Sequence, residues 1–161
     1  MQDWHLPLII AAGVFLAFIL WRVRPAVFTR ESFENRAALR EAQRRIEEAK
    51  DDKSRALALC DAGDAAAGTG RATSAIGFFL RAMRADPRSA EIVDRAAKAL
   101  ERRPRALESL MWRRLGAEPW SGDARDAARA ALTQLSALYA GPLRNTPRAK
   151  ALEHALDAIR A

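Results

Sequence analysis

Few side chains in this sequence could do nucleophilic or metal chemistry. The chain has one cysteine, Cys60, and two histidines, His5 and His154, too few for an internal disulfide or a Cys/His zinc site. Asp157 follows His154 by three residues, which puts both side chains on one face of a helix. A surface ion pair explains this spacing better than a catalytic dyad. We therefore predict no enzyme, no cofactor and no metal site.

Two further features receive structural interpretations. Gly68-Thr69-Gly70 superficially resembles a phosphate loop, but no strand pattern precedes it and no Lys-Ser/Thr pair follows. We interpret it as a turn between two helices. Cys60 lies in an alanine-rich stretch, where we expect a small packing residue instead of a reactive thiol.

An uncharged apolar segment runs from Trp4 to Trp21. Eighteen residues at about 1.5 Å each cover roughly 27 Å, close to the hydrocarbon thickness of a bilayer. We predict a transmembrane anchor over residues 1–24, with Trp4 and Trp21 at its interfaces. The alternative is a cleaved signal peptide, but the chain starts with an acid, Asp3, instead of a base, and no cleavage site is evident after the apolar run.

The charges beside this segment predict its orientation. Arg22 and Arg24 follow the apolar run, whereas no Lys or Arg precedes it. The positive-inside rule then places the N-terminus outside and residues 22–161 in the cytoplasm. We expect the anchor to lie in a bacterial inner membrane. The abundance of Arg and Ala over Lys and Ile is typical of a GC-rich bacterial genome. Gly13 and Ala17 form a small-xxx-small pair that would let two anchors associate, although such pairs also occur in membrane helices that do not pair.

Residues 25–53 form a charged juxtamembrane segment, and its part from residue 30 to 53 lacks Gly and Pro and predicts a helix. Its apolar stripe is thin and includes Leu39, Ala42, Ile46 and Ala49. Three arrangements remain open: a solvated stalk, a helix packed on the following domain, or a weak coiled coil.

From residue 54 to 161 the breaks at Gly and Pro are regular and the apolar period is helical. We predict six helices, over residues 54–67, 72–85, 89–102, 104–115, 121–140 and 147–160. Pro104 and Pro147 suit the first helical turn, and Ser89 and Ser121 suit N-caps. No stretch alternates as a strand would, so the predicted class is all-α. Short loops make neighbouring helices antiparallel, which gives three hairpins.

The spacing of five residues in the first hairpin resembles the tetratricopeptide repeat: Gly63, Ala75, Phe79, Ala82 and Pro87. The small residues let the helices of a hairpin approach, the aromatic ring fills the space between hairpins, and the proline ends the second helix. Leu59 and Ala66 depart from the pattern, because the family carries a large aromatic residue and a Tyr at those places.

The resemblance covers roughly residues 56–89. The next hairpin matches only loosely, and residues 121–160 have the character of a terminal cap over the last apolar face. Residues 54–161 would then form an α-solenoid of about three antiparallel hairpins.

The resemblance implies protein binding on a concave surface lined by the first helix of each hairpin. The matching positions are Leu57, Cys60, Asp64 and Ala67 in the first unit, and Glu91, Asp94, Lys98 and Glu101 in the second. Family members that hold a carboxylate tail use Lys, Asn and Arg there. Cys60 and Asp64 do not fit that chemistry, so a basic or mixed peptide is the better expectation.

The net charge is +7, from 27 basic and 20 acidic side chains. The densest basic cluster is Arg102, Arg103, Arg105, Arg113 and Arg114. Acids are interleaved throughout and no recognition motif occurs, so we expect no nucleic acid; the charge would face anionic lipid or serve solubility.

Trp112 and Trp120 flank the end of the second hairpin beside Arg113 and Arg114. That composition is typical of an interface hot spot, and core packing is the alternative. The predicted function is a membrane-anchored repeat adaptor or scaffold for protein–protein interaction. The alternative is an accessory structural subunit of a larger membrane complex.

Overall fold

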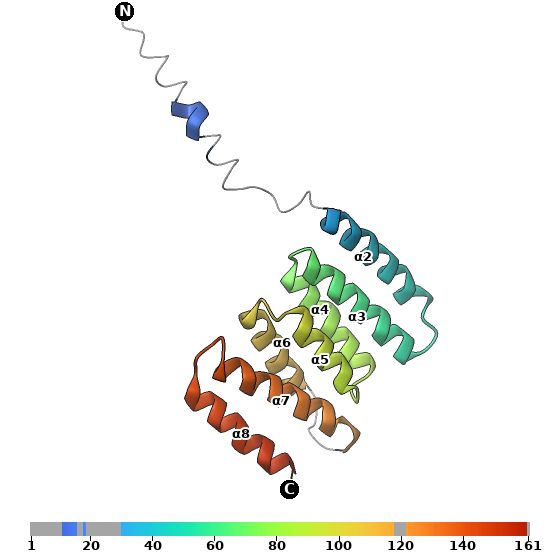
Figure 1. The fold of residues 1–161 in the computed structure, drawn as a ribbon. Coiled ribbons are helices and arrows are strands. Elements are labelled where there is room, and N and C mark those ends of the chain that lie inside the picture. The colour runs from blue at the N-terminus through green and yellow to red at the C-terminus, as the bar shows by residue number, and fades with distance from the viewer. Residues whose placement is uncertain (1–10, 16–17, 19–29, 118–121, 161) are drawn as a thin grey trace, which may run out of the picture.

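The computed structural model describes residues 11–15, 18, 30–117 and 122–160 (Figure 1). All regular secondary structure in these ranges is helical, which confirms the all-α class. Within the same ranges, no helix has the length and apolar character needed to cross a membrane. Most of the predicted span falls outside them, including Trp4, Ala17 and Trp21, as do Arg22 and Arg24.

From residue 30 onward the order of elements is α2 (Arg30–Glu48), α3 (Asp52–Gly68), α4 (Ala72–Ala85), α5 (Ala90–Ala99), α6 (Pro104–Ala117), η2 (Gly122–Ala124), α7 (Arg125–Ala140) and α8 (Thr146–Arg160). All six helices predicted after residue 53 are present. The largest boundary differences are at α5, which ends at Ala99, and at α7, which follows a short 3₁₀ turn.

The helix starts follow the predicted signals. The Ser89 hydroxyl accepts a hydrogen bond from the Ile92 amide at 3.4 Å and caps α5. Pro104 is the first residue of α6, and Pro147 lies in the first turn of α8. Ser121, the other predicted cap, lies outside the described residues.

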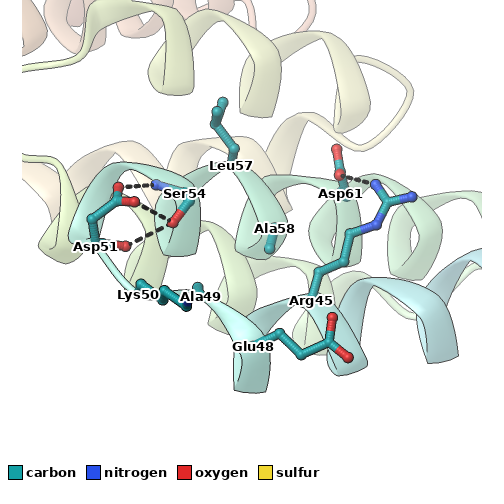
Figure 2. Close-up of a pocket in the computed structure, with 9 residues that line it drawn as sticks. All are labelled: Arg45, Glu48, Ala49, Lys50, Asp51, Ser54, Leu57, Ala58 and Asp61. Carbon is teal, nitrogen blue, oxygen red and sulfur yellow. Dashed lines mark hydrogen bonds and ion pairs between the residues drawn. The ribbon is translucent and has the colours of Figure 1, made fainter.

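The helix that the sequence predicts to run to residue 53 ends at Glu48. The chain reverses direction there, although the turn contains neither Gly nor Pro. Asp51 has an extended backbone, and its carboxylate accepts hydrogen bonds from the Ser54 amide at 2.7 Å and the Ser54 hydroxyl at 2.9 Å (Figure 2). Asp51 is therefore the N-cap of α3. Such local hydrogen bonds compete with continuation of the preceding helix.

The reversal lays α2 antiparallel on α3. Ala42 is buried and Ile46 packs against the core. Near the turn, the Arg45 guanidinium lies 3.5 Å from Asp61 on α3; at the far end, the Asn35 amide packs closely on Gly68. Of the three arrangements left open by the sequence, α2 adopts the one packed on the following helices.

The helices form two layers, which Figure 1 shows from the front. In the front layer α2, α3, α5 and α7 pack in succession, and α8 packs on α7 at the end of the chain. The back layer contains α4 and α6, which contact each other. The predicted outer hairpins, α3–α4 and α7–α8, are closely paired. The predicted middle hairpin is not: α5 packs chiefly on α3 and α7, and α6 packs on α4 and α7.

The residues that carry the repeat spacing lie where α3 and α4 meet. Gly63, Ala75, Phe79 and Ala82 are buried. A Cβ atom placed on Gly63 would lie 2.8 Å from the tip of the Phe79 ring, so a side chain at residue 63 would overlap the ring. Pro87 follows the end of α4, and its carbonyl accepts a hydrogen bond from Arg114 at 2.8 Å.

Candidate functional site

The outer side of α5 and the turn after it carry acidic and basic residues that the sequence predicted for partner binding. Asp94, Lys98 and Glu101 are exposed, and Lys98 and Glu101 line two hollows, one on each side of the helix. We call these three side chains and the two hollows the α5 face. Glu91 is also exposed on α5 but lines neither hollow.

The first hollow lies between α3 and α5 and has a volume of about 760 Å³. Its walls are mostly charged and comprise Asp64, Ala67, Gly68, Arg95, Lys98, Ala99, Glu101, Arg102 and Arg103. Arg103 donates a hydrogen bond to the Gly70 carbonyl at 2.6 Å, which ties the end of α5 to the turn after α3. Both signs of charge are present, so the hollow suits a ligand with polar groups of both signs.

The second hollow lies between α5 and α7, with a volume of about 370 Å³. Leu107, Leu138 and Pro142 supply apolar walls, and Lys98 and Glu101 supply charge. On its edge, Gln134 donates a hydrogen bond to Asp94 at 3.1 Å. An apolar side chain of a partner could enter here while its backbone contacts the charges on α5.

Asp64 is held by Arg95, a residue that no motif in the sequence indicated. Arg95 Nε lies 2.6 Å from Asp64 Oδ2, and a terminal nitrogen of Arg95 lies 2.5 Å from Asp61 Oδ1. Desolvation opposes the Arg95 charge, but the hydrogen bonds to both carboxylates outweigh it and raise the pKa of Arg95. At Asp64 desolvation is the larger effect, and it raises the pKa of that carboxyl despite Arg95.

This ion-paired cluster fastens α3 to α5 and removes Asp64 from the groups that are free to bind a partner. The signal in the sequence was indirect: Arg95 stands 34 residues after Asp61, which is the repeat length of the family that the spacing from Gly63 to Pro87 resembles. Equivalent positions of consecutive repeats become neighbours when hairpins stack.

The first unit contributes less to the surface than predicted. Leu57 is exposed beside the α2–α3 turn, in the hollow shown in Figure 2. Cys60 is fully buried in the core and does not line the α5 face, and desolvation raises the pKa of its thiol to about 11. That environment favours the packing role over a nucleophile.

Trp112 lies away from the α5 face, and 44% of its surface is exposed. Its indole N–H donates to the Tyr139 hydroxyl at 3.0 Å, and that hydroxyl donates to Glu108 at 2.5 Å. Arg148 also donates to the Tyr139 hydroxyl, at 3.2 Å. These hydrogen bonds fix one edge of the indole where α6 meets α7. Trp112 is therefore neither fully packed in the core nor fully free at the surface, the two roles considered from the sequence. Trp120 lies outside the described residues.

The basic cluster predicted from the sequence is divided between two places. Arg102 and Arg103 line the α3–α5 hollow. Arg113 and Arg114 line another hollow beside residues of α4. The division follows from the layers, because α5 is in front and α6 behind. Sequence proximity therefore did not produce one basic surface.

The described residues hold no group of three His, Cys, Asp or Glu side chains placed to bind a metal ion. His154 and Asp157 are both exposed on α8.

No protein-family model, curated protein or solved structure matches the chain. The likeness to tetratricopeptide repeats rests on the residues and spacing given above and stays a prediction.

Proposed function

We propose that the chain is a membrane-anchored helical-repeat adaptor that holds a protein partner at the cytoplasmic face of a bacterial inner membrane. The α5 face is the observation that carries the proposal. It joins exposed charges of both signs with an apolar hollow. Such a composition suits an extended or helical segment of another protein, with charged and apolar side chains alternating along it.

The anchor part of the proposal rests on the apolar run from Trp4 to Trp21 and on the basic residues that follow it. Val14 and Phe15, which the structure describes, are 65% and 64% exposed. Exposed apolar side chains of this size are suited to lipid or to another protein. Anchoring would put the α5 face near the membrane surface, where a partner is concentrated.

The partner site is tested by placing a photo-crosslinking residue at Glu101 and, as the matched control, at Arg81 on the back layer. Both positions are exposed, so they differ in the face they sample. A crosslinked species that forms from position 101 only, and that disappears with Lys98→Glu, supports the adaptor. Equal crosslinking from both positions would remove the α5 face as the site.

The topology is tested separately, with a reporter at the C-terminus that is active only in the cytoplasm. An active reporter on a membrane-bound chain is expected. A reporter active only on the periplasmic side would reverse the orientation and change the pool of available partners.

An accessory subunit of a larger membrane complex is the second candidate. Phe33, Leu57 and Trp112 are each 44% exposed or more, and a permanent neighbour would cover such side chains. Purification in mild detergent separates the two functions. A fixed stoichiometric complex supports the subunit, whereas a chain that purifies alone and captures its partner substoichiometrically supports the adaptor.

A further inference from the structure

The hollow between α4 and α6, in the back layer, collects three arginines. It has a volume of about 380 Å³ and is lined by Leu80, Met83, Arg84, Arg113, Arg114, Gly116 and Ala117. No acidic side chain is among these lining residues. Pockets of this size accommodate small ligands. It lies apart from the α5 face, on the other layer.

Arg114 is the least exposed of the three arginines. Only 4% of its surface is accessible, and one terminal nitrogen donates to the Pro87 carbonyl at 2.8 Å. Its Nε–H is sealed from solvent and has no acceptor among the residues that the structure describes. The lining residues offer this buried guanidinium no carboxylate. An unpaired buried charge is costly, so an anion beside it would recover stability.

The two helix ends at this hollow reduce its positive charge but do not cancel it. Arg84 lies in the last turn of α4, and Arg114 in the last turn of α6. Each helix C-terminus contributes roughly half a negative charge. Among the lining residues that the structure describes, three guanidinium groups against two helix ends leave a charge of about two positive, which matches the charge of a phosphate near neutral pH.

From this geometry we infer that the α4–α6 hollow binds a phosphate group. Arg84 and Arg113 are exposed at the hollow and are free to turn toward a ligand, while Arg114 holds positive charge beneath them. Guanidinium groups donate two parallel hydrogen bonds to phosphate oxygens. Leu80 and Met83 provide apolar contact for whatever carries the phosphate. The carrier is either a soluble phosphate compound or the headgroup of an anionic phospholipid.

The test is calorimetric titration of the full chain, in non-ionic detergent, with inorganic phosphate at constant ionic strength. We expect saturable binding at one site. Arg84→Gln and Arg113→Gln should each weaken it about tenfold, because each removes a charge-assisted pair. The control variants are Arg81→Gln on α4 and Arg105→Gln on α6, which remove exposed charges that do not line the hollow and should change affinity by less than about twofold.

The role of Arg114 is tested by NMR without substituting the residue, since a change at a buried site could prevent folding. Its side-chain Nε–H signal in a ¹⁵N NMR spectrum should shift as phosphate binds. Vesicles of phosphatidylcholine, with and without phosphatidic acid, identify the carrier. Displacement of phosphate by the phosphatidic acid vesicles alone assigns a lipid headgroup, and no displacement by either assigns a soluble ligand. Absence of saturable phosphate binding, or equal weakening by all four variants, would overturn the inference.

Discussion

Replacing Gly63 by alanine should destabilise the fold, although the same change usually strengthens a helix. The added methyl would lie 2.8 to 2.9 Å from three atoms of the Phe79 ring, which is fully buried and cannot move aside freely. Overpacking of this kind costs about 1–3 kcal/mol. The gain in helix propensity returns about 1 kcal/mol. We therefore expect a net loss of up to about 2 kcal/mol.

Gly77 provides the matched control. It lies in the interior of α4, is exposed, and has nothing within 4 Å of the position that a Cβ would take. Gly77→Ala should therefore stabilise the chain by up to about 1 kcal/mol. Because both variants share the propensity gain, the difference between them isolates the clash with Phe79, at about 1–3 kcal/mol.

The assay is urea unfolding of the full chain in detergent, followed by circular dichroism, with free energies from linear extrapolation. Phe79→Leu completes a double-mutant cycle, because a smaller side chain makes room for the methyl. Gly63→Ala should cost less in that background. If Gly63→Ala is as stable as Gly77→Ala, the close approach of α3 and α4 at Gly63 is wrong, and the strongest part of the repeat resemblance falls with it.

Three other predictions concern charge. Arg95→Gln should lower the free energy of unfolding by on the order of 1 kcal/mol at neutral pH, a figure discounted because the Arg95–Asp64 pair is more than a third exposed to solvent. The loss should be smaller in acid. Because the pKa of Asp64 is raised, its carboxylate is protonated early as the pH falls, and a neutral carboxyl no longer needs Arg95. Urea unfolding at pH 4 and pH 8 checks this, and an equal loss at both would contradict it. The Glu41 carboxyl should titrate with a pKa of about 2 instead of 4.5 by ¹³C NMR, because hydrogen bonds from Arg44 and then Arg45 lower its pKa. Its stabilising effect is complete above about pH 4.5 and disappears as the pH falls toward 2. A titration midpoint near pH 4.5 would show that these ion pairs do not persist. The Cys60 thiol, with its pKa raised to about 11 by desolvation, should resist alkylation of the native chain at pH 8 and react fully on unfolding; rapid native labelling would refute its burial.

The helices after residue 53 were predictable because Gly and Pro punctuate them and because Ser89 and Pro104 give local start signals. The reversal at Asp51 was not, since its signal is a single Asp–Ser hydrogen-bonded cap inside a run of good helix formers. Propensity summed over that run favours a continuous helix, and the cap together with packing of Ala42 on α3 overrides it.

The candidate site was predictable in part. Asp94, Lys98 and Glu101 were placed on the surface by repeat position alone, and they are exposed together on α5 and in the turn that follows it. The Arg95 cluster and the α4–α6 arginines depend on which helices become neighbours, which a local pattern does not encode. Arg84 and Arg114 are 30 residues apart in the sequence but line one hollow, because α4 and α6 share a layer.

The antiparallel docking of α2 has a mechanical consequence. Its N-terminal end lies beside the C-terminal end of α3, where Asn35 packs on Gly68, and its 19 residues run back to the capped turn at Asp51. A force that pulls the N-terminal segment away from the body therefore loads the α2–α3 contact from one end and peels it turn by turn. Full peeling into extended chain, at about 3.3 Å per residue against about 1.5 Å per residue in the helix, would add roughly 35 Å of reach. The helix is thus an extensible tether that yields before the body of the protein does.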